Sequence, residues 1–155
     1  MTYLFWLVSA LTIIPTHVGF VLTSNTEVGS ELAKQFDWKE EATEWNTAIS
    51  SISIFGLIIG SFTAIFFVRK GRRNTIIWMS FVGIIGIIPT LFLNIWLILA
   101  GKLIYGFSAG VMIVAASLYL QETVPAVKSA TFDFTTNFGV ILGITINLVA
   151  GFALP

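Results

Sequence analysis

Long apolar runs separated by short polar segments make up most of the chain. Residues 3–23 and 47–68 are two such runs, and neither contains Asp, Glu, Lys or Arg. Each is about 20 residues long, which is the length an α-helix needs to cross the hydrocarbon core of a bilayer. No basic segment precedes the first run, so we interpret it as a retained helix rather than a cleaved signal peptide. The pattern predicts membrane-spanning helices at 3–23 and 47–68.

The third apolar run, residues 75–120, is too long for one span. Lys102 is the only charged residue in it. As a single helix rising 1.5 Å per residue, it would be about 69 Å long, more than twice the thickness of the hydrocarbon core. We place the break at Pro89 and Asn94, because proline and a polar residue interrupt an apolar helix. The predicted spans are therefore 75–93 and 95–120, and a last apolar run predicts a fifth span at 134–154.

The composition indicates an integral membrane protein. Of the 155 residues, 56% are hydrophobic and 10% are charged, and the mean hydropathy is +0.92. Soluble domains contain about 25% charged residues. The unbroken apolar runs exclude the alternating strands of a membrane barrel. We therefore expect an all-α membrane protein with five transmembrane helices and no soluble catalytic domain.

The residue types exclude several functional classes. Eight basic residues balance eight acidic ones, so no basic surface for nucleic acid is expected. The absence of cysteine excludes disulfides, thiolate metal sites and cysteine nucleophiles. His17 is the single histidine, and we expect it to pack or line a cavity rather than to bind a metal. Without a phosphate loop, a catalytic carboxylate pair or a Ser/His/Asp set, we expect no enzyme, no catalytic residue and no cofactor.

The polar loops differ in charge. The loop 24–46 holds six acidic residues and two lysines, whereas the short loop 69–74 holds four cations. Short loops rich in Lys and Arg stay on the cytoplasmic side of a membrane. We therefore expect the N-terminus and the loops 69–74 and 121–133 to be cytoplasmic. Three tryptophans near span ends, Trp6, Trp78 and Trp96, are expected to act as interface anchors.

Pairs of glycines four residues apart recur along the predicted helices. Helices in a bilayer associate through close contact between small residues, and this spacing puts both glycines on one helix face. We therefore expect the second, fourth and fifth spans to pack against neighbours at these positions. The pairs are Gly56 and Gly60, Gly106 and Gly110, and Gly139 and Gly143.

The basic loop resembles a motif of a known superfamily. Its sequence Arg-Lys-Gly-Arg-Arg at 69–73 is similar to the Asp-Arg-x-Gly-Arg-Arg loop between the second and third helices of the major facilitator superfamily. The glycine permits a tight turn, and the arginines can bond helix ends and carboxylates. Val68 and Ala64 stand where that superfamily has an aspartate and usually a glycine, and Ser129 and Ala130 replace a later arginine and glycine.

The fourth and fifth spans carry a more specific pattern. Residues 101–106 read Gly-Lys-Leu-Ile-Tyr-Gly, Gly110 follows, and residues 119–125 read Tyr-Leu-Gln-Glu-Thr-Val-Pro. This is similar to the sugar porter pattern Gly-Arg-x-x-x-Gly-x-x-x-Gly followed by Tyr-x-x-Glu-x-x-Pro. Asn137 with Gly143 resembles the Gln-x-x-x-x-x-Gly of the fifth sugar porter helix. The chain is identified as a member of the sugar porter branch, corresponding to its N-terminal five-helix portion.

The resemblance implies a solute carrier of twelve helices, in which two six-helix bundles move about a substrate site near the bilayer midplane. This chain would supply five helices, and a C-terminal bundle or partner membrane subunits would supply the rest. The expected solute is a sugar or a similar small polar molecule. Val21 stands where proton-coupled members have a carboxylate, which favours facilitative transport. The alternative is a truncated, transport-inactive structural subunit of a larger membrane complex.

The resemblance also implies roles for single residues. Asn137 takes the place of a substrate-contacting glutamine, and joining two helices is its alternative role. Lys102 takes the place of an intramembrane arginine, and its alternative is to pair with a helix-end carbonyl or to extend to the interface. Glu122 with Arg72 or Arg73 would form the charge network that holds the outward-facing state in relatives. The implied gating or conformational motif is Arg69, Gly71, Arg72, Arg73, Lys102 and Glu122.

Overall fold

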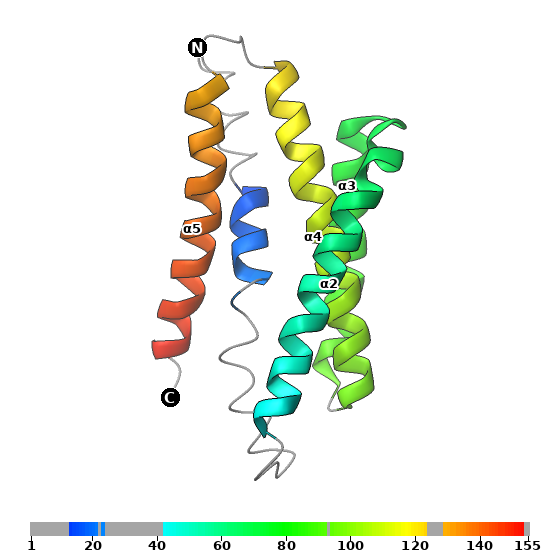
Figure 1. Ribbon diagram of the computed structural model, residues 1–155, viewed down its shortest axis with the longest axis vertical. Coiled ribbons are helices and arrows are strands. Elements are labelled where there is room, and N and C mark those ends of the chain that lie inside the picture. Colours follow the sequence, from blue (N-terminus) through cyan, green and yellow to red (C-terminus); the bar gives the residue numbers. More distant parts are fainter. Residues whose placement is uncertain (1–12, 22, 24–41, 93, 124–128, 154–155) are drawn as a thin grey trace.

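The computed structural model describes residues 13–21, 23, 42–92, 94–123 and 129–153, and helices account for nearly all of them (Figure 1). No strand occurs in this described part of the chain, which confirms the predicted all-α class. The helices are 13–21, α2 (Ala42–Val68), α3 (Arg72–Ile87), α4 (Ile95–Thr123) and α5 (Ser129–Ala153), with a short 3-10 helix, η1 (Ile88–Leu91), between α3 and α4.

Three of these segments are long and apolar enough to cross a membrane: Glu44–Val68, Arg72–Leu91 and Ile95–Thr123. The apolar part of α5, Asn137–Ala150, is shorter. The remainder of the predicted first span, most of the acidic loop, and Trp6 lie outside the described residues.

The helices extend beyond the apolar runs that predicted them. α2 begins at Ala42, before residue 47, and α3 begins at Arg72, before residue 75. α4 continues to Thr123, and α5 begins at Ser129, ahead of residue 134. The length of an apolar run matches the hydrocarbon core, which is about 30 Å thick, whereas the whole bilayer with its headgroups is about 40–45 Å thick. Helical backbone therefore continues through polar residues at the membrane surface.

The break between α3 and α4 lies where proline and asparagine predicted it. Pro89 stands in the first turn of η1, where its missing N–H costs no hydrogen bond. Asn94 then begins α4: its Oδ1 accepts a hydrogen bond from the Trp96 N–H at 3.1 Å, and its carbonyl accepts one from Ile98 at 2.9 Å. This is an N-cap, which satisfies backbone donors that a helix start leaves unpaired.

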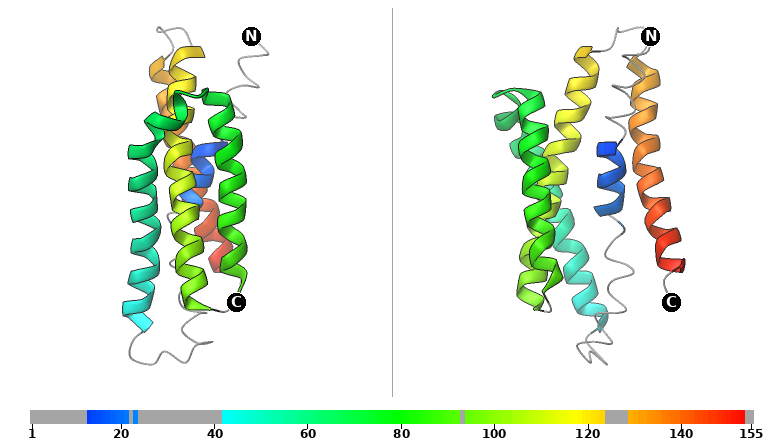
Figure 2. Two further views of the ribbon diagram at one scale, coloured as in Figure 1. Left: turned by 90° about the vertical axis from the view of Figure 1, so that its right-hand side faces the viewer. Right: turned by 180° about the vertical axis from the view of Figure 1, so that it is seen from behind.

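α4 is the central helix of the bundle. α2 and α3 lie on either side of it in the left view of Figure 2, and the helix at 13–21 lies between α4 and α5 in Figure 1. In the most apolar part of each candidate span, 56% of Ile95–Thr123 is buried, against 22% of Glu44–Val68 and 22% of Arg72–Leu91. Most helix contacts are therefore built around α4.

Glycine brings the backbones of α2 and α4 into direct contact. Added side-chain carbons at these glycines would collide with the backbone of the facing helix, which is the close approach that small residues permit in membranes. The contacts are Gly56 with the Leu103 carbonyl, Gly60 with Phe107, Gly106 with Ser53 and Gly110 with Leu57.

Two further contacts of this kind join other helix pairs. Gly83 and Gly86 of α3 lie against Ser108 and Tyr105 of α4. The helix at 13–21 crosses α5 at two glycines: Gly19 meets the Val140 carbonyl, and Gly143 of α5 meets the Thr16 carbonyl. Gly139, which also belongs to α5, is buried.

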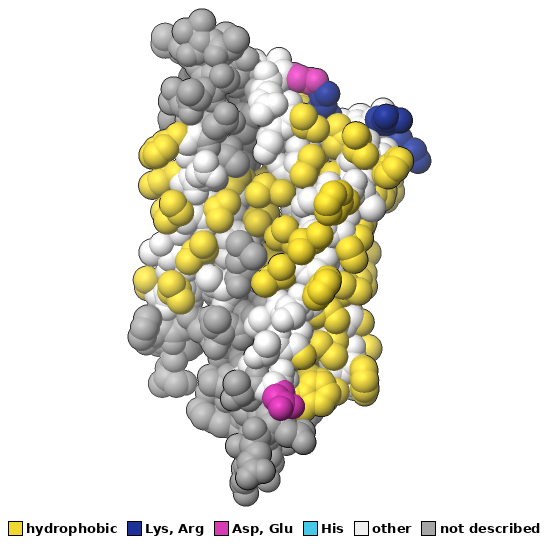
Figure 3. Space-filling view, in the orientation of Figure 1, with side chains coloured by type: hydrophobic (Ala, Val, Ile, Leu, Met, Phe, Trp, Pro, Cys, Tyr) yellow, Lys and Arg dark blue, Asp and Glu magenta, His cyan; other side chains and the backbone are white. Residues whose placement is uncertain are grey.

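The surface of the bundle is apolar between two charged ends (Figure 3). Lys, Arg and acidic side chains gather at the upper end in that view and a further acidic group lies at the lower end. Hydrophobic side chains cover the middle of this face. The exposed large hydrophobic side chains of the described residues include Phe62 at 78% and Phe66 at 67%. A soluble protein rarely exposes a continuous apolar surface of this size, so the chain is a multi-pass integral membrane protein.

Candidate functional site

A tight turn joins α2 to α3 and presents the four cations of the basic loop. The Lys70 N–H donates to the Phe67 carbonyl and the Gly71 N–H to the Val68 carbonyl, both at 3.0 Å. Gly71 has a φ of +118°, a backbone conformation that glycine adopts readily and other residues avoid. α3 then begins at Arg72. The turn needs glycine at position 71.

Thr75 holds this turn from inside, a role that the sequence patterns did not reveal. Its hydroxyl lies 2.8 Å from the Phe67 carbonyl and 3.0 Å from the Gly71 carbonyl, and the residue is only 5% exposed. The hydroxyl thus links the last turn of α2 to the first turn of α3. A threonine four residues after the turn glycine is the signal that could have indicated it, because such hydroxyls commonly bond the carbonyl four residues back.

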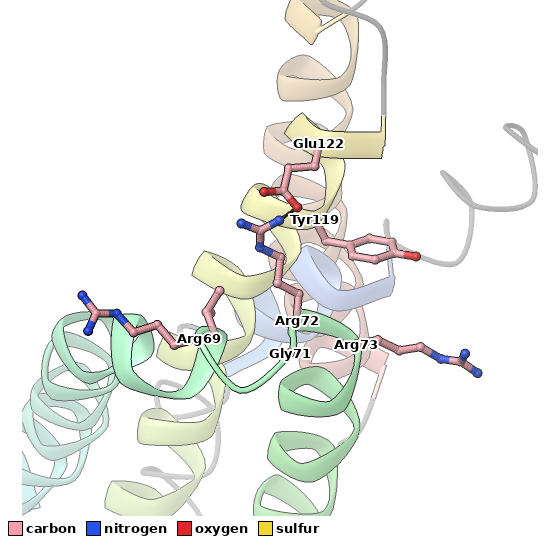
Figure 4. A pocket seen from close by; sticks show the side chains of 7 residues that line it. Arg69, Gly71, Arg72, Arg73, Tyr119 and Glu122 are labelled. Atoms are coloured by element: carbon pink, nitrogen blue, oxygen red, sulfur yellow. Dashed lines mark ion pairs between the residues drawn. The ribbon is translucent and has the colours of Figure 1, made fainter.

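An open pocket of about 430 Å³ lies between this turn and the end of α4. Arg72 points toward Glu122 and forms an ion pair with it, whereas Arg69 and Arg73 point away on opposite sides (Figure 4). The sequence left Arg72 and Arg73 as alternative partners of Glu122, and the structure pairs Arg72. The lining residues are Val68, Arg69, Gly71, Arg72, Arg73, Tyr119 and Glu122.

The Arg72–Glu122 pair is partly exposed. The Arg72 side chain is 30% exposed and the Glu122 side chain 53%. Water screens charges at such positions, so an ion pair there contributes about 0.2–1 kcal/mol. A contact of this strength joins α3 to α4 and can also break and re-form at little cost.

Lys102 lies apart from this pocket. It is 9% exposed, and twenty residues of α4 separate it from Glu122, or about 30 Å along the helix. A cation this deep in a span faces protein rather than lipid, because lipid exposure costs about 2.5–3.5 kcal/mol. Lys102 therefore belongs to the interior of the bundle and not to the charged end.

One turn along α4 from Lys102, Tyr105 faces the helix at 13–21. The Tyr105 ring contacts the His17 ring edge to face, with centroids 4.8 Å apart and an interplanar angle of 80°. Val21 is 1% exposed and belongs to a buried apolar cluster with Val18, Tyr105 and Ala109. His17 thus packs against α4 through this ring contact. No group of three potential metal ligands occurs among the described residues.

Two asparagines of α5 occupy different surroundings. Asn137 is exposed, whereas Asn147 is 5% exposed and its Nδ2 donates to the Thr23 hydroxyl at 2.9 Å. The Thr23 hydroxyl in turn donates to the Gly19 carbonyl at 3.0 Å. Asn147 therefore links α5 to the first helix. The sequence analysis passed over it, although a second polar amide in an apolar span is the usual signal for such a link.

Comparison with known proteins identifies the family. A family model described as "Sugar (and other) transporter" matches residues 9–154. The chain belongs to the sugar transporter family. This confirms the resemblance to sugar porters of the major facilitator superfamily found in the sequence, and the members of this family are transporters rather than enzymes.

Curated relatives within the sugar transporter family cover most of the chain. It is 33% identical over 138 residues to the facilitated trehalose transporter Tret1 of Polypedilum vanderplanki, with 88% of this chain and 26% of the relative covered. It is 32% identical over 109 residues to the D-xylose-proton symporter-like 1 of Arabidopsis thaliana, with 68% and 21% covered. It is 28% identical over 114 residues to facilitated glucose transporter member 3 of Rattus norvegicus, with 70% and 23% covered. The chain thus spans about a quarter of the length of these relatives.

Proposed function

We propose that the chain forms part of a membrane carrier for a sugar or a similar small polar solute. The observation that carries this proposal is the match of the sugar transporter family to residues 9–154. Relatives named for trehalose, xylose and glucose transport support a sugar as the solute class. The helices that complete the carrier would come from a C-terminal bundle or from partner membrane subunits.

In this proposal the turn at 69–73 and the end of α4 form a conformational latch. Arg72 and Glu122 close it, Gly71 shapes it, and Arg69 and Arg73 flank it. The weakness of a half-exposed ion pair supports this role, because a latch has to open in each transport cycle. We assign this end to the cytoplasmic side, because short loops rich in Lys and Arg stay on that side of a membrane.

The solute would meet the exposed side of α5. We assign the contact to Asn137, whose amide has both a donor and an acceptor for sugar hydroxyls. Its exposure supports the assignment, because a substrate-contacting group has to stay accessible within the five-helix unit. Asn147 is buried against the first helix and is therefore assigned to packing.

We further propose that transport is facilitative. The curated relatives include both facilitated carriers and a proton symporter, so the local residues carry the argument. Val21 is buried against Tyr105 and Ala109, and an apolar side chain cannot take up and release a proton. Movement down a concentration gradient needs no such group.

The test is uptake by the native protein, purified from its own membrane and reconstituted in vesicles after its intact mass is measured. We expect saturable uptake of at least one of labelled trehalose, xylose and glucose, unchanged by a protonophore. Accumulation driven by a proton gradient would overturn the facilitative mode alone. Absence of uptake above protein-free vesicles would overturn the transport proposal, and migration with a larger complex in mild detergent would favour the structural-subunit alternative.

Lys102 gives a sharper form of the same test. We expect Lys102→Ala to abolish uptake, because a buried cation in α4 is retained in a span only at a cost of about 2.5–3.5 kcal/mol. Leu103→Ala is the matched control, since Leu103 is the neighbouring side chain and is 37% exposed. Unchanged uptake by Lys102→Ala would remove Lys102 from the transport mechanism.

A further inference from the structure

A crevice runs between α2 and α3 on the face of the bundle opposite to α5. In the left view of Figure 2, α2 and α3 lie on either side of α4, and the 69–73 turn joins α2 to α3 toward the upper end. Gly56 and Gly60 hold α2 on α4, and Gly83 and Gly86 hold α3 on it. Close contacts of these glycines with α4 thus set how near α2 and α3 lie to it.

The lower half of the crevice is an apolar chamber of about 310 Å³. Hydrophobic side chains and one glycine line it, and no polar side chain takes part. Its residues are Gly56, Ile59, Val82, Leu103, Ile104 and Phe107. Such a chamber in the middle of a span suits a hydrocarbon chain.

The upper half has a volume of about 430 Å³, and its lining changes from apolar to polar side chains toward the turn. Val82 and Met79 line its deep part, and Trp78, Asn74 and Lys70 line the part nearest the turn. Val82 belongs to both halves, and the Phe67 ring of the upper half contacts the Phe107 ring of the lower half at 6.3 Å between centroids. The two halves therefore adjoin at Val82.

The depth of the crevice matches one leaflet of a bilayer. From Gly56 to Val68, α2 rises about 18 Å, and the turn that carries Lys70 lies just beyond. Half of a bilayer of about 40–45 Å is about 20–22 Å. Trp78 is exposed beside Lys70 in this crevice, at the depth where tryptophans gather in membrane proteins. The crevice thus extends from the headgroup region to the bilayer midplane.

The charge of the upper end selects the headgroup. Lys70 and Asn74 are exposed there, and the lining residues of this half include no carboxylate. On the other side of the same turn, by contrast, Glu122 meets Arg72. The first turn of α3 begins beside Lys70, and the start of a helix favours a negative charge. An anionic group therefore complements this end better than a zwitterionic one.

We propose that the crevice binds one anionic phospholipid. Its phosphate lies at Lys70 and Asn74, its glycerol region lies beside Trp78, and one acyl chain passes Met79 and Val82 into the chamber under Phe107. The lipid fills the gap between α2 and α3 and so holds the basic turn in place from the side opposite to Glu122.

The headgroup contact is tested by native mass spectrometry of the full-length protein from phosphatidylcholine nanodiscs that contain an increasing fraction of phosphatidic acid. We expect Lys70→Gln to weaken phosphatidic acid binding about fivefold. Arg69→Gln is the matched control, because it removes the same charge from the same turn but Arg69 does not line the crevice. Equal weakening by both variants would show that the turn attracts lipid only by its total charge and would overturn the site.

The acyl-chain contact is tested with two neighbouring isoleucines of α2. Ile59 is 50% exposed and lines the chamber, whereas Ile58 is 45% exposed and does not line it. We expect Ile59→Trp to fill the chamber and reduce phosphatidic acid binding, and Ile58→Trp to leave it unchanged. Retained binding in folded Ile59→Trp would overturn the assignment of the chain.

A water-soluble competitor separates a lipid site from a phosphate site. Glycerol phosphate carries the same anionic group without acyl chains, so we expect it not to displace the bound lipid. Displacement at concentrations similar to those of phosphatidic acid would overturn the lipid proposal in favour of a site for phosphate alone. If the tryptophan variants fail to fold, Lys70→Gln against Arg69→Gln still decides. None of these measurements needs transport activity, so they stand apart from the proposed function.

Discussion

Two contacts of α4 differ in kind, although both join it to a neighbouring helix of the same bundle. Along its length α4 meets α2 backbone against backbone, through glycines such as Gly60 and Gly106. At its Thr123 end it meets the start of α3 through the Arg72–Glu122 ion pair, which is partly exposed. The first contact consists of several close backbone approaches, and the second is a single, partly exposed ion pair.

The two contacts differ in how much free energy is lost when they open. Close backbone packing loses many dispersion contacts at once when it opens, whereas an exposed ion pair loses about 0.2–1 kcal/mol. Under the proposed function, α2 and α4 would therefore move as one body, and the charged end would rearrange. The following variants test each side of this comparison.

The largest effect is expected at the glycine contact. Gly106→Leu places a side chain against the Ser53 carbonyl of α2, so the helices have to separate. We expect a loss of about 3 kcal/mol of stability, the upper end of the usual cost of overpacking, because the added side chain meets backbone rather than a side chain that can move aside. Thermal unfolding in detergent measures it, and Ala100→Leu on the exposed side of α4 is the control. Equal stability of the two variants would show that backbone contact does not hold α2 to α4.

A smaller loss is expected at the turn. Gly71→Ala forces a residue with a side chain to a φ of +118°, which costs about 1–3 kcal/mol. Asn74→Ala, in the first turn of α3, removes a side chain without changing the turn glycine and is expected to change stability by less than about 0.5 kcal/mol. The same unfolding measurement applies. A neutral Gly71→Ala would mean that the turn relaxes to a different conformation.

The two asparagines of α5 give a matched pair with a smaller effect still. Asn147→Leu removes the hydrogen bond to Thr23 and should lower stability by about 1 kcal/mol, which lies within the range of about 0.6–2 kcal/mol for interhelical hydrogen bonds in membranes. Asn137→Leu should leave stability unchanged, because Asn137 is exposed, and should weaken sugar uptake instead. The reverse result would exchange the packing and substrate roles of these residues.

The apolar pattern of the sequence predicted helices in the parts of the chain that the structure describes. Runs without charge gave the spans because the hydrocarbon core tolerates little else, and Pro89 and Asn94 located the break because one lacks a donor and the other caps a helix. The pattern did not give the helix ends. Polar residues such as Glu122 continue a helix beyond the core as readily as they end it.

The site was predictable as a set of residues but not as a set of contacts. The motifs singled out Arg72, Arg73 and Glu122, yet only the direction in which α3 leaves Gly71 decides that Arg72 reaches Glu122. Thr75 and Asn147 were missed because a single hydroxyl or amide gives no repeating pattern. The crevice between α2 and α3 depends on how three helices cross, which no local signal in the sequence reports.

The smallest effect is expected for the ion pair itself. A double-mutant cycle with Arg72→Gln and Glu122→Gln should give a coupling energy of about 0.5 kcal/mol, since both side chains are partly exposed. The parallel cycle with Arg73→Gln should give no coupling, because Arg73 points away from Glu122 (Figure 4). Unfolding in detergent at low ionic strength makes the coupling largest, and added salt should reduce it.

The size of this coupling energy tests whether the ion pair is a weaker contact than the glycine packing between α2 and α4. If the coupling exceeded about 3 kcal/mol, the pair would behave as a buried one, and the charged end would be as fixed as the glycine contact. If Arg73 coupled to Glu122 as strongly as Arg72 does, the total charge of the turn would matter rather than one geometry. The exchanged pair, Arg72→Glu with Glu122→Arg, separates these cases, because it restores the contact only where the two positions face each other.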